Sequence, residues 1–405
     1  MSENATSSKS GPLSGIKVVD IATLIAGPMA AAYLADFGAD VIKVEHPQGD
    51  SLRRFGWEAG DTSLWWKIVN RGKRCITLNL KTPAGARLLE RILKDADVLI
   101  ENFRPGTLEK WGIGWERLSL VNPRLVMLRT TGYGQTGPYR DRPGYGTLAE
   151  AISGFAYANG FQDSPPLLPP YALGDEVCGL FGTCAVMFAI YERDVVGCGK
   201  GQFIDLSINE SLFAILGPMV SVYDQLGLIV GRQGNRIPFA SPRNIYETRD
   251  NKWVALAASS QSIAERVFHA IGRSDLINDR RFVDNVNRVE NNAALDKIIS
   301  GWIKEQTLRE VTEHFEANDA AIAPVYNIGD IFEDPHYRAR EAIVSVPDSH
   351  LGSIRMQSVF PKLSRSPGCI RHAGQQLGEG NEEIFVNELG LSREEIQSLH
   401  AEGAI

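Results

Sequence analysis

The chain has 405 residues, more than one hydrophobic core usually holds, so its length predicts two domains. Its formal net charge of −7 argues against non-specific binding to nucleic acid, whose phosphates require basic patches. The five cysteines form no CxxC pair and the seven histidines no HExxH motif, so we expect a cytoplasmic protein without a disulfide framework or metal site.

Two further classes of segment are excluded by composition. The first twelve residues are polar and predict a disordered tail, 1–12, rather than a signal peptide. No apolar run approaches the length of a membrane span, since the segment "GTCAVMFAIY" is too short and is followed by "ERD".

The first half of the chain alternates short apolar strands with helices. Strands are expected at 16–21, 39–47, 74–80, 97–103, 124–134 and 202–208, and helices at 26–38, 83–96 and 176–193, the last of them buried. Strands separated by helices indicate crossover units and a mostly parallel sheet covered on both faces. We therefore predict an α/β domain over residues 13–225.

The second half has a different texture. Turn-forming residues at 231–244 predict a linker, and a strand at 252–260 with helices at 262–272, 291–306 and 308–319 predicts a smaller α+β domain at 230–330. The remaining section, 335–405, ends in a helix with a capping box formed by Ser392 and Glu395.

A glycine-rich stretch, "GYGQTG" at 132–137, matches half of a dinucleotide-binding fingerprint. Pro138 and Pro143 block the helix that should hold the pyrophosphate, and the first crossover unit, which ends in the acid Glu45, has one glycine in its turn. A nicotinamide or flavin enzyme is therefore disfavoured. The stretch is either a surface loop or, as we favour, a ligand loop at the carboxyl ends of parallel strands.

Two further strand-end loops are rich in basic residues. The segment 101–118 contains Asn102, Phe103, Arg104 and Lys110, and the segment 70–85 contains Arg71, Lys73, Arg74 and Lys81. A solvated basic flank is the ordinary interpretation of one such loop. Two of them with aromatic neighbours favour a ligand that has phosphates and an aromatic base.

One carboxylate, Asp175, stands at the start of an apolar helix within "PPYALGDEVCGLFG" (169–182). Asp is a favoured N-cap residue, so this position by itself indicates either a helix cap or a nucleophile.

Several motifs together resemble the family III CoA-transferases: 26–47, "ENFRPGTLEKWGIG" at 101–114, "ALGDEVCG" at 172–179, 197–211, 279–292, 322–343 and "LGEGNEEI" at 377–384. The resemblance covers nearly the whole chain beyond the tail. It implies a Rossmann-like large domain completed by a return segment, 335–405, with the smaller domain inserted. It also implies a dimer of two interlocked rings.

The resemblance implies that Asp175 attacks an acyl-CoA thioester and forms a mixed anhydride and then an aspartyl-CoA thioester. From its place at the helix start we expect backbone N–H groups to keep the Asp175 carboxylate ionised, as a nucleophile must be. It assigns coenzyme A binding to Leu24, Ala26, His46, Leu78, Lys81, Asn102, Phe103, Arg104, Lys110 and Tyr145. No cofactor beyond coenzyme A and no metal are implied. Ile25 stands where related enzymes often have Gln, and 257–262 is stiffer than the glycine-rich lid of the oxalate enzymes.

The loop sequences resemble most the branch that transfers CoA from succinyl-CoA to dicarboxylic acids such as malate or benzylsuccinate. A second carboxylate needs a cation, and Arg140 and Arg142 are candidates unless they are merely solvated. Two alternatives remain. An acyl-CoA racemase would use a His near Asp175, but Gly144 and Tyr145 stand where a His-Asp pair is expected. The chain could also be one subunit of a heteromer, with a homodimer as the simpler partner arrangement.

Overall fold

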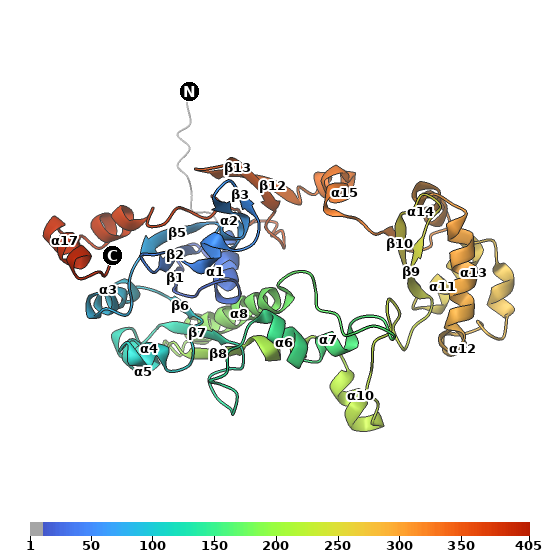
Figure 1. Cartoon of the computed structure of the whole chain (residues 1–405), viewed down its shortest axis with the longest axis horizontal. Helices are drawn as coiled ribbons and strands as arrows, with labels where there is room; N and C mark the ends of the chain where they lie inside the picture. The colour runs from blue at the N-terminus through green and yellow to red at the C-terminus, as the bar shows by residue number, and fades with distance from the viewer. Residues whose placement is uncertain (1–10) are drawn as a thin grey trace. The chain divides into compact units, whose positions relative to one another are not determined.

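The computed structural model describes residues 11–405, so all but the end of the predicted tail, 1–12, lies outside the described residues. The described chain divides into two compact units. The first unit combines residues up to Phe155 with Leu168–Pro218 and Arg338–Ile405, and the second combines Ala156–Leu167 with Met219–Tyr337. Figure 1 shows the elements of each unit.

The first unit is built on a six-stranded sheet in the order β5-β2-β1-β6-β7-β8, with every neighbouring pair parallel. Its strands are β1 (Lys17–Asp20), β2 (Asp40–Glu45), β5 (Lys73–Thr77), β6 (Val98–Glu101), β7 (Val126–Thr131) and β8 (Phe203–Ser207). These pairings confirm the prediction of an α/β fold with a mostly parallel sheet. The strands are largely buried, as helices on both faces of a parallel sheet require, except for the edge strand β8, where Phe203 is exposed.

Helices cover the two faces of this sheet. One face packs against α3 (Pro83–Leu93) through Leu88, Leu89 and Ile92, and the other packs against α1 (Ala26–Asp36) and α8 (Leu173–Tyr191). Small residues let α1 and α8 approach closely: a side chain at Gly179 would meet the Cβ of Met29 at 3.0 Å. Their close packing fixes the start of α8 against the sheet.

Helix α8 differs from the prediction in two ways. It begins at Leu173 and continues through a π-helical segment to Val196, which makes residues Leu173–Val196 long and apolar enough, by length and composition alone, to cross a membrane. It is also buried on one side only, since Phe188 and Tyr191 are 73% and 58% exposed. Because α8 packs against α1, β7 and β8, we interpret it as a helix of the sheet's outer layer.

The remaining helices and strands of the first unit surround this sheet: β3 (Glu58–Ala59), β4 (Thr62–Ser63), α2 (Leu64–Val69), α4 (Thr107–Lys110), α5 (Trp115–Val121), α6 (Gly146–Ile152), α9 (Ile208–Ala214), β12 (Ile343–Asp348), β13 (Gly352–Gln357) and α17 (Arg393–Ala401). The predicted capping box of α17 is confirmed, because Ser392 Oγ accepts from the backbone N of Glu395 and Glu395 accepts from the backbone N of Ser392. Two helices, α7 (Phe155–Ala158) and α16 (Pro335–Ala339), stand where the chain passes between units.

The second unit has an antiparallel sheet in the order β11-β10-β9 covered by helices, with its own core around Phe268, Phe282 and Phe315. Its elements are α10 (Met219–Leu226), β9 (Arg243–Glu247), β10 (Trp253–Ala257), α11 (Gln261–Ala270), α12 (Asn285–Glu290), α13 (Asn292–Lys304), α14 (Leu308–Ala317), β11 (Ile322–Pro324) and α15 (Ile328–Glu333). Segment 257–262, at the start of α11, lies in this unit, and Ser260 caps that helix.

Candidate active site

Asp175 lies in the first turn of α8, at the junction of two cavities of the first unit. The N-cap of α8 is Ala172, which has no side-chain oxygen, so Asp175 is not the helix cap that its sequence position allowed. Asp175 lines both cavities, and so do Leu24, Ile25 and Tyr145.

The larger cavity, of about 920 Å³, is mainly aromatic and apolar. Its lining includes Phe55, Trp57, Trp65, Leu168, Pro169, Pro170 and Tyr171. Its ionisable carboxyl groups are those of Asp175 and Glu150, and no Lys or Arg is among the described residues that line it.

The smaller cavity, of about 250 Å³, is lined by polar side chains and by three positively charged arginines. It lies at the carboxyl ends of β1, β6 and β7 and is lined by Asn102, Phe103 and Arg104 together with Arg140 and Arg142 of the glycine-rich loop. Arg142 stacks over the ring of Tyr139, with its guanidinium carbon 3.7 Å from the ring centroid. An anionic ligand with an apolar body fits such a lining.

The carboxyl group of Asp175 has an altered acidity. Burial first, and then the negative charges of Glu150 and Glu176, raise the pKa of Asp175 from 3.8 to about 7. The prediction that the helix start would keep this group strongly ionised is therefore wrong in direction, since partial burial and two neighbouring acids outweigh the helix N-terminus. Glu176 is held by the hydroxyl of Tyr33 at 2.9 Å.

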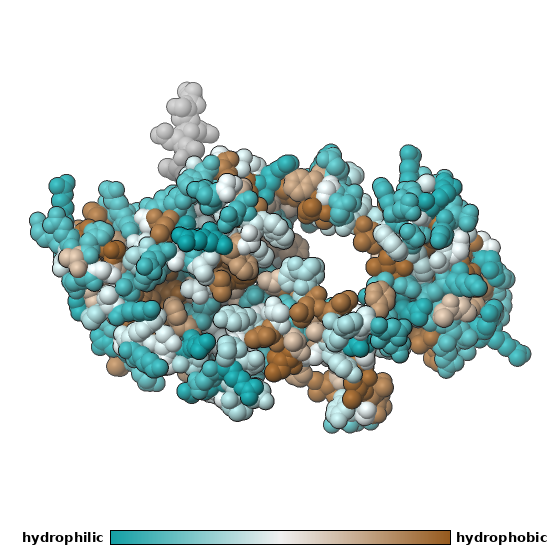
Figure 2. All heavy atoms as spheres, in the orientation of Figure 1, coloured by the Kyte–Doolittle hydropathy of each residue, from teal (hydrophilic) through white to brown (hydrophobic). Residues whose placement is uncertain are grey.

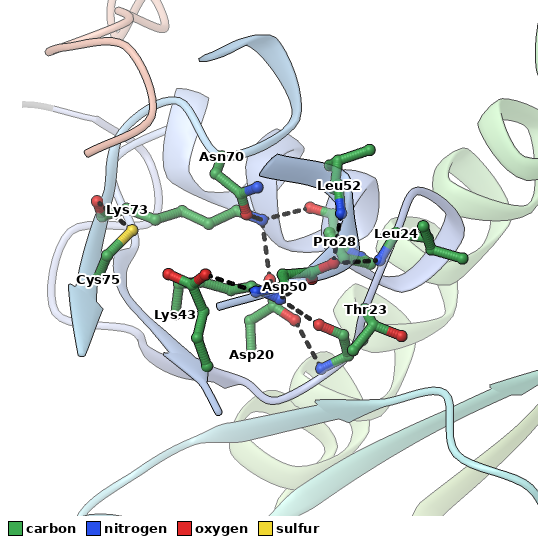
Figure 3. A network of polar contacts seen from close by, with 12 residues as sticks. Asp20, Thr23, Leu24, Pro28, Lys43, Asp50, Leu52, Asn70, Lys73 and Cys75 are labelled. Carbon is green, nitrogen blue, oxygen red and sulfur yellow. Dashed lines mark hydrogen bonds and ion pairs between the residues drawn. The ribbon is translucent and has the colours of Figure 1, made fainter. Parts of the chain in front are cut away.

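Residues 22–28, which we call the 22–28 turn, comprise the end of the connection between β1 and α1 and the first three residues of α1. They form the wall shared by both cavities, and a buried polar network holds them (Figure 3). Asp20 accepts from the backbone N of Ala22 at 3.0 Å, and Asp50 accepts from the backbone N of Leu24 at 3.5 Å. Lys43 Nζ donates to the carbonyl oxygen of Ala22.

The same network reaches the start of α1. Lys73 Nζ donates to the carbonyl oxygen of Pro28 at 2.7 Å and pairs with Asp20 at 2.8 Å. Lys43 pairs with Asp20 and Asp50 at 3.8 and 3.5 Å, and all four charged side chains are almost completely buried. These contacts fix Leu24 in a left-handed backbone conformation, φ 62°, which is uncommon for a residue other than Gly.

The 22–28 turn is also held by Asn102, the residue that follows β6. Asn102 accepts from the backbone N of Thr23 at 2.8 Å and donates to its carbonyl oxygen at 2.7 Å. Its amide is therefore committed to the turn, while Phe103 packs edge-on against Trp111 with ring centroids 5.1 Å apart. Asn102 therefore both lines the smaller cavity and holds the wall of that cavity in place.

The structure brings most of the predicted coenzyme A residues together. The smaller cavity is lined by six of them, Leu24, Ala26, Asn102, Phe103, Arg104 and Tyr145, with Asp175, Arg140 and Arg142. Four predicted residues line neither cavity. His46, Lys81 and Lys110 are exposed near the same edge of the sheet, and the side chain of Leu78 is buried in the core.

Three basic residues of the segment 70–85 have structural roles, contrary to the expectation that they bind a ligand. Arg71 pairs with Asp36 at 2.6 Å, Lys73 belongs to the buried network, and Arg74 pairs with Asp40 at 2.7 Å. Glu45, the acid of the disfavoured dinucleotide fingerprint, is likewise occupied, because Arg53 Nη2 pairs with it at 2.7 Å.

Sequence reasoning missed the aromatic wall of the larger cavity and Glu150. Phe55, Trp57 and Trp65 come from the segment between β2 and β5, which has no motif of its own, and Trp65 lies in the first turn of α2. Tyr171 follows the two prolines before α8. Glu150 stands in "GTLAEAI" as one helical acid among many. Its contact with α8 is visible only in three dimensions.

Comparison with known proteins agrees with this site. The model of "CoA-transferase family III" matches residues 13–381. The chain is 43% identical to the "Succinyl-CoA–L-malate CoA-transferase beta subunit" of Chloroflexus aurantiacus, over 97% of this chain and 98% of that protein. It is 38% identical to the "Succinyl-CoA–D-citramalate CoA-transferase" of the same organism, over 97% and 98%.

A solved structure has the same fold. The crystal structure of a CAIB/BAIF family protein from Brucella suis superposes with a TM-score of 0.83 at 30% identity, covering 93% of this chain and 99% of that one. The family match spans both units and contains Asp175 and all the described residues that line the two cavities. The chain is therefore a CoA-transferase and belongs to CoA-transferase family III.

Proposed function

We propose that this enzyme transfers coenzyme A from succinyl-CoA to a dicarboxylic acid of the malate or citramalate kind, through acyl intermediates on Asp175. The observation that supports this most is that Asp175 lines both the smaller cavity, which has cationic side chains, and the larger, apolar cavity. The relatives named for malate and citramalate transfer support the substrate class.

The proposed reaction begins at the carboxylate of Asp175. One carboxylate oxygen forms a bond to the thioester carbonyl carbon, and the C–S bond breaks to release the CoA thiolate and leave a mixed anhydride. The thiolate then attacks the Asp175 carbonyl carbon of that anhydride. This step releases the donor acid as its carboxylate and leaves an aspartyl-CoA thioester.

The second half repeats these steps with the acceptor. The acceptor carboxylate attacks the aspartyl-CoA thioester, releasing the thiolate, which attacks the acceptor carbonyl of the new anhydride and restores the Asp175 carboxylate. No electron or net proton is exchanged, so we propose no cofactor beyond coenzyme A and no metal.

The residues that line the smaller cavity and its wall have distinct roles in this proposal. Arg104, Arg140 and Arg142 supply the cations that phosphates or a distal carboxylate require, and Phe103 supplies an aromatic face. The buried network and Asn102 hold the 22–28 turn, so the thioester approaches Asp175 along a fixed wall. Ile25 adds an apolar side chain there, where related enzymes often have Gln.

Exposed apolar side chains support assembly with a second subunit. Phe188, Tyr191 and Val196 of the α8 segment are each at least 58% exposed, and Figure 2 shows further apolar side chains over α6, where Leu148 and Ile152 are exposed. We propose that the chain assembles as a homodimer or with a homologous subunit in the cytoplasm. The "beta subunit" in the name of one relative supports the second arrangement.

The racemase alternative gains no support from the site. The racemases that resemble this family use a His together with the Asp to move the proton at the carbon next to the thioester carbonyl, and none of the described residues that line the two cavities is a His.

The test is covalent trapping. The wild type incubated with succinyl-CoA alone should acquire a hydroxylamine- and borohydride-sensitive acyl group at Asp175, detected by peptide mass spectrometry. Asp175→Asn and Asp175→Ala should abolish transfer and trapping while coenzyme A still binds. Transfer by Asp175→Asn, or exchange of the substrate's α-proton with solvent without a modified Asp175, would refute the proposal.

A further inference from the structure

One turn of α6 faces the first turn of α8 with two residues, Gly146 and Glu150. They are four positions apart and therefore lie on the same face of α6. A side chain at 146 would collide with Asp175, since its Cβ would lie 2.3 Å from Asp175 Oδ2. Glu150 Oε1 accepts from the backbone N of Gly174, the residue before Asp175, at 3.1 Å.

Glu150 is 2% exposed and also lines the larger cavity with Asp175. A cap for α8 alone would need only an oxygen acceptor, which Ser, Thr or Asp at position 172 would supply locally. The chain has Ala172 there and takes the acceptor from another helix, as a carboxylate placed beside the nucleophile. The geometry therefore combines a cap with a second carboxyl group in the cavity.

We propose that Glu150 is a positioning residue that activates Asp175 electrostatically: its charge disfavours the free Asp175 carboxylate relative to the uncharged acyl-aspartyl forms. This inference rests on the proposed function. Each attack by Asp175 removes the negative charge from its side chain, so a fixed neighbouring charge favours that step. A more basic carboxylate is also a stronger nucleophile.

The acidity of Asp175 agrees with this geometry. After burial, Glu150 is the largest contribution to the raised pKa of Asp175, ahead of Glu176. Burial raises the pKa of Glu176, and the hydroxyl of Tyr33, which donates to it, and the charge of Arg71 oppose that rise. The charge of Glu176 is therefore partly compensated by its own neighbours.

Other ionisable groups lie on the elements next to this pair or line the two cavities, and their ionisation contributes to the pH profile of the wild type and of each variant alike. They are Tyr33 on α1, Tyr145 before α6, Tyr171 before α8, Glu176 and Cys178 on α8, Glu210 on α9, Arg71 after α2, and Arg104, Arg140 and Arg142 in the smaller cavity.

The decisive variant is Glu150→Gln, which keeps the size and the Oε1 acceptor for Gly174 but removes the charge. With succinyl-CoA as the probe, the acid limb of kcat/KM should move to lower pH by roughly 0.5–1 unit, because a like charge is lost. Hydroxylamine-trapped Asp175 at pH 8 should form about 3–10-fold more slowly, with coenzyme A affinity and melting temperature nearly unchanged.

Glu192→Gln is the matched control, since it removes an exposed acid from the opposite end of α8 and should leave both readouts unchanged. Glu150→Ala removes cap and charge together, so it should shift the acid limb as Gln does and lower the melting temperature as well.

The outcomes separate the two proposals. If the wild type is trapped but Glu150→Gln has the same acid limb of kcat/KM and the same trapping rate, Glu150 acts only as a helix cap. That result would overturn this inference and leave the proposed function standing. Absence of trapping in the wild type would overturn the proposed function together with it. Should the Gln variant not fold, Glu150→Asp places the charge one methylene farther from Asp175 and should also move the acid limb of kcat/KM to lower pH. An unchanged acid limb in that variant would overturn the inference as well.

Discussion

Gly146 lies directly against the carboxyl group of Asp175: a Cβ at position 146 would be 2.3 Å from Asp175 Oδ2 and 2.9 Å from its Cγ. Such distances are far inside van der Waals contact, so one of the two residues would have to move. The absence of a side chain at 146 thus makes the observed position of Asp175 possible.

Gly146→Ala should therefore displace the Asp175 carboxylate by a fraction of an ångström or more. We expect kcat/KM to fall on the order of 100-fold, because misplacement of a reacting group by about 1 Å has that effect. Steady-state kinetics with succinyl-CoA measure it. Gly301→Ala, where nothing lies within 4 Å of the new methyl group, should retain full activity, and equal rates in both variants would contradict the argument.

The raised pKa of Asp175 predicts a pH-dependent stability. The folded-state pKa is about 7 and the ordinary value is 3.8, so ionisation of Asp175 destabilises the folded protein as the pH rises through this window. Asp175→Asn should be more stable than the wild type at pH 8 by on the order of 1–2 kcal/mol, allowing for solvent screening of this half-buried group.

Urea unfolding at two pH values measures this difference. At pH 4 the Asp175 carboxyl group is mostly protonated in the folded wild type, so the two proteins should be nearly equally stable. A stability gain for Asp175→Asn that is the same at pH 4 and pH 8 would exclude ionisation as its cause.

The cations of the smaller cavity predict a substrate preference. Arg140 and Arg142 line it with Asp175, whereas the larger cavity has no Lys or Arg among its described lining residues. Arg140→Ala and Arg142→Ala should therefore raise KM for dicarboxylate acceptors about 10-fold or more, the effect of losing a charged hydrogen bond, and raise it less for monocarboxylates. A panel of acids with succinyl-CoA as donor measures this, and equal effects on both classes would disprove the clamp.

The buried network predicts strong coupling between Lys43 and Asp50. Lys43→Met leaves buried carboxylates without one of their two lysines and should lower the free energy of unfolding by about 3–5 kcal/mol. Lys43→Met/Asp50→Asn removes one charge of each sign, and the side-chain amide introduced by the second substitution keeps an oxygen for the backbone N of Leu24. The double variant should therefore recover part of the loss.

Urea unfolding of Lys43→Met, Asp50→Asn and the double variant measures the coupling, with Lys81→Met as the control. Lys81 is exposed, so its substitution should change the unfolding free energy by no more than about 0.5 kcal/mol. Additive effects of the Lys43 and Asp50 substitutions would show that the network does not act as a unit.

The sequence by itself determined the parallel sheet and the place of Asp175. Apolar runs such as 97–103 and 124–134 are local patterns, and strand-end loops meet at one sheet edge whenever the sheet is parallel. For that reason the loop with Asn102, Phe103 and Arg104 could be assigned to a ligand site in advance, and the family resemblance added Asp175 to that site. The capping box of α17 was equally predictable, because Ser392 and Glu395 contact each other within one helical turn.

Only the tertiary structure decided what each charged group does. Lys73 looks like a ligand-binding base in the sequence, yet it is buried against Asp20, 53 residues away, and Glu150 contacts the backbone of Gly174, 24 residues away. The acidity of Asp175 depends on those surroundings too. Electrostatic energies depend on distance and burial in space, and both arise only when crossover connections bring distant segments of the chain together.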